Sequence, residues 1–207
     1  MNLLGRTHGK LVHSRRVRRL SEELSGLVSP NATILDVGCG DGLIASLINA
    51  TRPDVEIQGI DVLVRGSTHI PVGNFDGSTI PFPDKSFDSV MFVDVLHHTD
   101  DPMVMLREGC RVSRESLILK DHTDEGFLSN ATLRFMDWVG NKPHGVVLPY
   151  NYWRENAWKN AIEELNLTTE AWHTDLKLYP QPADLIFGRS LHFVAKLNVP
   201  WASATGD

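Results

Sequence analysis

Histidine and aspartate residues follow two neighbouring strand-like runs of this chain, and together they could move a proton. One apolar run ends shortly before His97 and His98, and the next ends just before Asp121 and His122. The carboxyl ends of parallel strands meet at one edge of an open α/β sheet, where ligands bind. A histidine near neutral pKa can take a proton from a hydroxyl group. We therefore expect His97 to act as a general base that Asp121 orients.

A glycine turn early in the chain indicates a ligand of another kind. The apolar run Ile34–Val37 stops at Gly38, Gly40 and Gly42, and a helix-patterned segment starts at Leu43. Glycines at the end of a strand let the backbone approach a ligand closely. The first N–H groups of the following helix are free to bind an anionic group. The turn predicts a site for a nucleotide-like cofactor.

The common nucleotide fingerprints do not fit this turn. The dinucleotide pattern G-x-G-x-x-G would need a glycine where Leu43 stands, and no G-x-x-x-x-G-K-[ST] loop is present. The residues instead read D-x-G-x-G-x-G, beginning at Asp36. A second acid, Asp61, ends the next predicted strand 19 residues after Gly42.

Two further motifs follow in order. Residues 76–88 read D-x-x-x-I-P-F-x-D-x-S-F-D, and residues 96–102 read L-H-H-x-x-D-P. Together with the glycine turn and Asp61, these motifs make the chain resemble the class I, Rossmann-like methyltransferases, which bind S-adenosylmethionine (SAM). Within that class the chain is most similar to the small-molecule branch that resembles methyltransferase domain 11.

The resemblance implies roles for matching positions. Asp36 and the glycine turn would hold the methionine part of the cofactor, Asp61 the ribose, Asp76 with the Gly77 backbone the adenine amino group, and Asp94 would lie beneath the methionine. The implied cofactor-binding residues are Asp36, Gly38, Gly40, Gly42, Asp61, Val62, Asp76, Gly77 and Asp94. For Asp61 and Asp76 the alternative is a simple turn acid.

The resemblance also offers another interpretation of the residues proposed as a general base. The His-His pair is common in the family, including members that methylate carbon, so these histidines could instead pack or cap their loop. The implied catalytic candidates remain His97, Asp121, His98 and His122. A metal is not expected, because these residues and His144 show no H-x-x-x-H or C-x-x-C spacing.

Alternating strand and helix patterns from Ile34 to Leu119 predict an α/β fold with a doubly wound, mostly parallel sheet. The resembled fold has seven strands in the order 3-2-1-4-5-7-6, with the last strand antiparallel and helices on both faces. We expect a cap helix region at 1–30, a SAM-binding domain at 31–198 and a tail at 199–207.

An aromatic-rich insert at about 124–153 is our candidate for a lid over the substrate. Phe135 and Trp138 are more simply explained as helix packing, whereas Tyr150, Tyr152 and His144 could equally face a substrate.

Charge and composition limit the partners. The 207 residues carry a net charge of −6, but residues 1–30 hold six Lys/Arg and two Glu, a net +4, which leaves −10 for the remainder. An acidic body disfavours nucleic acid. The basic segment 6–19 could touch a membrane surface peripherally, although a solvated helix face is the simpler interpretation. We find no apolar stretch of about 18 residues and no apolar leader, and therefore expect a cytoplasmic protein; its oligomeric state cannot be read.

The sequence thus predicts a SAM-dependent methyltransferase acting on an oxygen or carbon of a small, apolar or ring-containing molecule. The loop after the fourth strand, Asp94-Val-Leu-His97, lacks the Asn/Asp-Pro-Pro-aromatic motif of many enzymes that methylate amide or base nitrogen. Two alternatives stay open: a SAM-binding subunit or regulator without turnover, and an NAD-dependent oxidoreductase.

Overall fold

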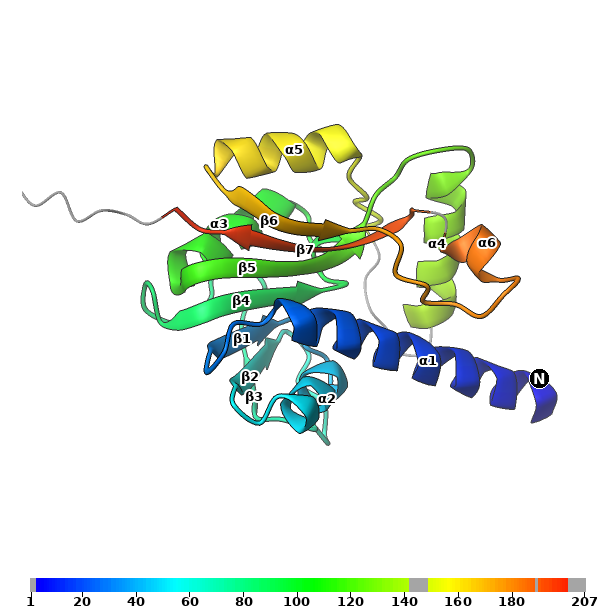
Figure 1. Ribbon diagram of the computed structural model, residues 1–207, viewed down its shortest axis with the longest axis horizontal. Coiled ribbons are helices and arrows are strands. Elements are labelled where there is room, and N and C mark those ends of the chain that lie inside the picture. The colour runs from blue at the N-terminus through cyan, green and yellow to red at the C-terminus, as the bar shows by residue number, and fades with distance from the viewer. Residues whose placement is uncertain (1–2, 142–148, 189, 201–207) are drawn as a thin grey trace, which may run out of the picture.

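The computed structural model describes residues 3–141, 149–188 and 190–200. Along the chain the elements are α1 (Leu3–Leu27), β1 (Thr33–Val37), α2 (Leu43–Thr51), β2 (Glu56–Asp61), β3 (Val72–Asn74), β4 (Phe87–Val93), the short 3-10 helix η1 (Leu96–His98), α3 (Pro102–Val112), β5 (Ser113–His122), α4 (Ser129–Asn141), α5 (Glu155–Glu164), β6 (Thr168–His173), α6 (Asp184–Phe187) and β7 (His192–Asn198) (Figure 1).

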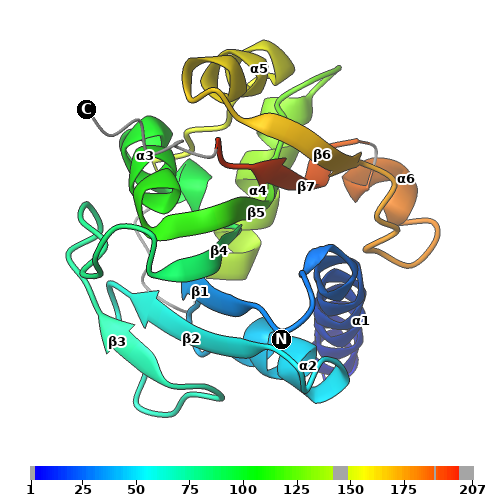
Figure 2. The same ribbon diagram turned by 60° about the vertical axis from the view of Figure 1, so that its left-hand side comes forward.

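The strands form a single seven-stranded sheet in the order β3-β2-β1-β4-β5-β7-β6 (Figure 2). The pairs from β3 to β5 are parallel, and β7 runs antiparallel to both of its neighbours, β5 and β6. Both the expected strand order and the expected antiparallel last strand are confirmed. This topology places the carboxyl ends of β1, β4 and β5 side by side.

Helices cover both faces of the sheet, and each face has its own apolar core. One core joins sheet residues such as Leu35 and Phe92 to Leu106 of α3 and Trp158 of α5. The other joins the opposite face to Leu20 and Leu24 of α1 and to Ala45 and Ile48 of α2. Because β1 is buried on both faces, its apolar residues are consecutive rather than alternating.

Local signals in the sequence explain the start of α3. Asp101 caps the helix by accepting a hydrogen bond from the backbone N–H of Met103 at 2.9 Å, and Pro102 occupies the first turn, where a missing N–H costs nothing. These signals fix the start of the helix, which runs to Val112.

Strand β5 extends beyond the apolar residues 117–119 at both ends. It begins at Ser113 and continues through Asp121 and His122, which pair with Phe193 and His192 of β7. The antiparallel partner, distant in sequence, supplies the hydrogen bonds that extend the strand. In contrast, β3 has only three residues and lies at the edge of the sheet.

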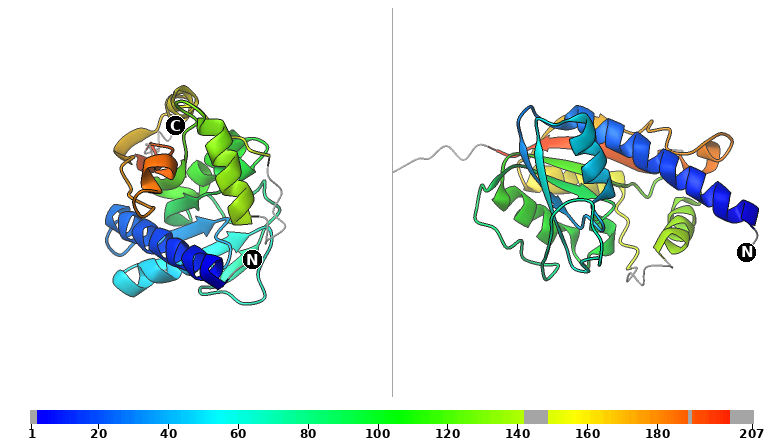
Figure 3. Two further views of the ribbon diagram at one scale, coloured as in Figure 1. Left: turned by 90° about the vertical axis from the view of Figure 1, so that its right-hand side faces the viewer. Right: turned by 90° about the horizontal axis from the view of Figure 1, so that it is seen from below.

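Helices α1, α4 and α6 lie together at one end of the molecule, as the views in Figure 3 show. Leu20 and Leu24 of α1 pack inward and Arg18 faces solvent, but Arg16 contacts Asp94. The basic segment is thus not a uniformly solvated face. Within the described ranges, no helix is long and apolar enough to cross a membrane.

The packing of α1 can be tested by truncating Leu24, which is fully buried against α2 and the sheet. Leu24→Ala should lower the free energy of unfolding by about 2–5 kcal/mol, because it leaves a cavity in the core. The exposed control Arg18→Ala should change it by less than about 0.5 kcal/mol. Urea unfolding followed by circular dichroism measures both. Equal effects would mean that α1 is not part of the packed domain.

Candidate active site

A cavity of about 290 Å³ lies at the glycine turn, beside the carboxyl ends of β1 and β4. Its walls include Arg16, Asp36, Gly38, Gly40, Arg65 and Asp94. The three glycines of the turn have φ angles of +71°, +61° and +74°. A Cβ atom at Gly38 would lie 2.6 Å from Val95, whereas one at Gly40 would meet nothing within 4 Å. The turn therefore brings bare backbone to the wall of the cavity.

Asp36 is a buried acid whose carboxylate is not fully hydrogen-bonded among the described residues. Only 3% of its surface is exposed, and one carboxylate oxygen has no hydrogen-bond partner among the described residues. Burial, with a smaller contribution from nearby Asp61, raises the pKa of Asp36 to about 8. A ligand that carries a positive charge or an N–H donor would satisfy this group.

The two other strand-end acids are occupied by local backbone. Asp61 accepts hydrogen bonds from the backbone N–H groups of Gly40 and Leu63, both at 2.8 Å. Asp76 accepts from those of Ser78 and Thr79, which lower its pKa. These contacts are those of turn acids, and they also hold both carboxylates at the ends of their strands.

The positions that follow these acids carry different signals. Val62, the residue after Asp61, is apolar, yet 58% of its surface is exposed. Gly77, after Asp76, has a φ of +84°, and a Cβ atom there would lie 3.1 Å from Val62. Val62 and the Gly77 backbone thus lie next to one another.

Asp94 is held between two cations from different elements. It forms ion pairs with Arg16 of α1 and with Lys120 of β5, whose side chain is fully buried. Burial alone would raise the pKa of Asp94, but the two positive charges outweigh it and hold the pKa far below its ordinary range. Burial disfavours the charged form of Lys120 and so lowers the pKa of its amine. The three charges link α1, β4 and β5 at the cavity.

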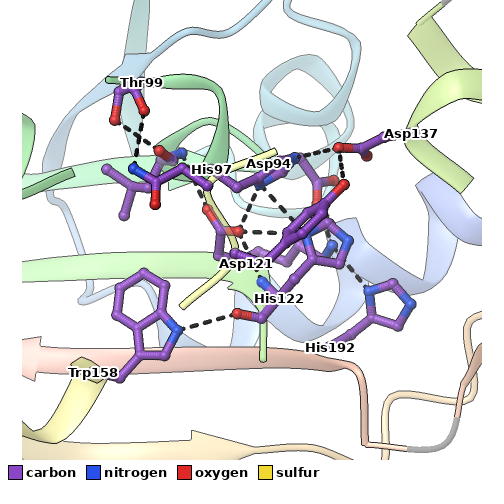
Figure 4. Close-up of polar contacts among 12 residues, drawn as sticks. Asp94, His97, Thr99, Asp121, His122, Asp137, Trp158 and His192 are labelled. Carbon is purple, nitrogen blue, oxygen red and sulfur yellow. Dashed lines mark hydrogen bonds and ion pairs between the residues drawn. The ribbon is translucent and has the colours of Figure 1, made fainter. Parts of the chain in front are cut away.

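The structure brings His97 and Asp121 together (Figure 4). The Nδ1 atom of His97 lies 2.6 Å from Asp121, and its Nε2 atom lies 3.3 Å from Asp137 of α4. Burial by itself would lower the pKa of His97, but the two carboxylates outweigh it and raise the pKa to about 10. His97 therefore carries a proton on both nitrogens at neutral pH.

Asp121 holds more than this one imidazole. Its carboxylate also accepts the backbone N–H groups of Leu96 at 3.1 Å and His122 at 2.8 Å. Burial opposes ionisation, yet the charge of His97 and the hydrogen bonds keep the pKa of Asp121 far below its ordinary value. Asp121 thereby fixes the loop that carries η1 onto β5.

The other histidines of the site are neutral. Burial lowers the pKa of His98, and it lowers those of His122 and His192 well below 6.5. His98 is half-buried, and its Nδ1 atom has no hydrogen-bond partner in the described part of the chain. His122 is inside the protein, with its ring centre 4.6 Å from that of His97.

Two groups of three side chains place ligating atoms within 4.8 Å of one another, close enough to surround a metal ion. They are His97, Asp121 and His122, and His97, His98 and Asp137. Both groups need a nitrogen of His97, and each of those nitrogens already faces a carboxylate. Among the described residues these contacts form a network of hydrogen bonds and ion pairs.

Three residues of the site were not singled out from sequence: Arg16, Lys120 and Asp137. A lysine ending the apolar run 117–119 was a signal for a buried charge. Arg16 is one of several arginines on α1, and nothing local distinguishes it. Tyr152 lies at the site, with its ring stacked on His97 and its hydroxyl bonded to Asp137, whereas His144 lies outside the described residues.

Comparison with known proteins finds methyltransferases. The 27-O-demethylrifamycin SV methyltransferase of Amycolatopsis mediterranei is 31% identical over 111 residues, which are 46% of this chain and 40% of that protein. An O-methyltransferase of Aspergillus nomiae is 35% identical over 113 residues, 48% of this chain and 49% of that protein. The matched region thus spans less than half of these relatives.

A crystal structure of an S-adenosylmethionine-dependent methyltransferase from Mesorhizobium loti has the same fold, with a TM-score of 0.63 and 15% identity, covering 86% of this chain and 96% of that one. A family profile described as a methyltransferase domain matches residues 10–171. The chain therefore belongs to the family described as a methyltransferase domain.

Proposed function

We propose that this protein transfers the methyl group of SAM to a hydroxyl oxygen of a small, ring-containing molecule. The observation that carries the proposal is the cavity at the glycine turn, in which Asp36 presents a buried, unpartnered carboxylate oxygen. Of the two relatives described above, one is named an O-methyltransferase and the other a 27-O-demethylrifamycin SV methyltransferase, and both names support oxygen as the acceptor atom.

The residues of the cavity fit the amino-acid end of the cofactor. An α-amino acid carries one positive and one negative group, and the wall offers both counterparts. In the proposal, Arg16 binds the carboxylate, while Asp36 and Asp94 face the ammonium group. Charge-assisted hydrogen bonds of this kind are the strongest that side chains make. The backbone at Gly38, Gly40 and Gly42 lies against the same end.

The nucleoside end would lie along β2 and β3. We propose that Asp61 binds the ribose hydroxyls and that Val62 packs its exposed side chain against the adenine ring. Asp76 and the Gly77 backbone would meet the adenine amino group. Because Asp61 and Asp76 already accept backbone N–H groups, their oxygens are held in place before the cofactor arrives.

Once bound, the cofactor supplies an electrophilic methyl group on a positively charged sulfur. The protein must align the acceptor oxygen with this group and remove the hydroxyl proton. A base needs an unprotonated nitrogen, which His97 lacks at neutral pH because its pKa is about 10. We propose that His98, whose pKa burial lowers, takes the proton as the oxygen–carbon bond forms and the carbon–sulfur bond breaks. His97 and Asp121 then position the loop, and His122 lines its inner side.

The direct test is transfer of radiolabelled methyl groups from SAM to a panel of catechol, 1,4-naphthohydroquinone and a macrocyclic alcohol. We expect labelled methyl ether, identified by mass spectrometry and NMR, from at least one of the hydroxylated rings. A carbon-methylated product would move the reaction to carbon. SAM binding by calorimetry without any transfer would favour a non-catalytic regulator, and NADH binding without SAM binding would favour an oxidoreductase.

The affinity for SAM should depend on pH through Asp36. Below pH 8 the acid is protonated, so binding of a positively charged ligand must release its proton. Affinity should therefore rise by up to about tenfold per pH unit from pH 6 and level off above pH 8. Isothermal titration calorimetry measures this dependence. Asp36→Asn should remove it, and an unchanged profile in that variant would separate Asp36 from the cofactor.

Replacing Arg16 should weaken cofactor binding more than it weakens the fold. Arg16→Gln should raise the dissociation constant for SAM at least about tenfold, the amount expected for loss of one charged hydrogen bond. Arg18→Gln, two residues away on the exposed face of α1, is the matched control and should bind normally. Equal affinities for both variants would assign Arg16 to structure alone.

A further inference from the structure

The imidazole of His97 joins two parts of the fold that no backbone pairing connects. On one side it contacts Asp121, which lies in the sheet; on the other it faces Asp137, which lies on α4 (Figure 4). All three side chains are buried, with 2% of His97 exposed. A buried charge is stable only when it is paired, and here one cation is shared by two anions.

Tyr152 completes this arrangement from the far side. Its hydroxyl donates a hydrogen bond to Asp137 at 2.5 Å, and its ring stacks on His97 with the ring centres 5.4 Å apart. It thus orients the Asp137 carboxylate and covers the imidazole at once. Four side chains from β5, η1, α4 and the segment before α5 therefore meet at one point.

We propose that Asp137 is a positioning residue that ties α4 to His97 and so holds the acceptor side of the site together. The tie depends on the positive charge of His97. The proposal rests on the function above only in assuming that the candidate lid at about 124–153, which holds α4, covers the acceptor, because the contacts themselves involve neither cofactor nor acceptor.

The pH range in which His97 stays paired with Asp137 depends on the charged groups around His97. Asp121, His122 and the more distant Asp94 face it from the sheet side, His98 adjoins it, and Asp137 and Tyr152 cover it. The pKa of His97, about 10, lies above the ordinary 6.5, so folding favours the charged form. The tie is therefore complete below pH 6.5, holds at neutral pH and is lost as the pH rises through about 10.

Asp137→Asn tests the tie without any acceptor. NMR of the histidine ring nitrogens should show that His97 stays doubly protonated to pH 9 in the native protein. In the variant its pKa should fall by about one unit or more, because one of two carboxylates is gone. Hydrogen exchange at pH 7 should quicken about tenfold across α4. Glu155→Gln, which removes an exposed acid on α5, is the control and should change neither quantity.

Tyr152→Phe separates the tie from general loss of structure. It keeps both carboxylates and the stacked ring, so His97 should remain charged while α4 exchanges faster than in the native protein. SAM affinity should stay within twofold in both variants, which keeps this test separate from that of the methyl transfer. An unshifted His97 in Asp137→Asn, unchanged exchange of α4, or Zn²⁺ retained by the purified protein at His97 would each overturn the proposal.

Discussion

The buried charge of Lys120 is the constraint on which the rest of the site depends. Its side chain is wholly inside the protein and its partner is Asp94, which is also paired with Arg16. Breaking a buried ion pair by removing one member typically costs about 3–5 kcal/mol, because the other charge is left without compensation. The pairing therefore fixes the end of β4 against β5 and draws α1 to the cavity. The cofactor crevice has its shape because these charges must meet.

The same edge of the sheet sets four histidines in different protonation states. His97 lies between two carboxylates and is charged, whereas burial keeps His98, His122 and His192 neutral. Lys120 contributes to the low pKa of both His122 and His192. Residue type alone therefore says little about which histidine accepts a proton. The neighbours of each ring set its pKa, and His98 is the one that combines a lowered pKa with a residue that is only partly buried.

The glycine turn and the pairing of His97 with Asp121 could be predicted, because each depends on local spacing or on the ends of neighbouring strands. The strand order was implied by the resemblance to the methyltransferases and not by the spacing of residues. The extension of β5 could not, since it needs β7, some 70 residues later in the chain. Arg16 and Asp94 are 78 residues apart in the chain, and the residues around each give no sign that the two side chains pair. Asp137 escaped notice for the same reason. The second carboxylate, Asp137, also changes the expected role of His97, because it favours the protonated imidazole, which cannot act as a base.

Helix α1 has a consequence for the order in which this protein is completed during synthesis. Arg16 leaves the ribosome 78 residues ahead of its partner Asp94, and Lys120, which also pairs with Asp94, follows later still. At the usual rate of about 5–20 residues per second, α1 waits roughly 4–16 seconds before Asp94 can bind Arg16. Leu20 and Leu24 of the helix have no core to pack against until the sheet forms. The cavity at the glycine turn is thus among the last features to form, although Arg16 in its wall is made before its partners.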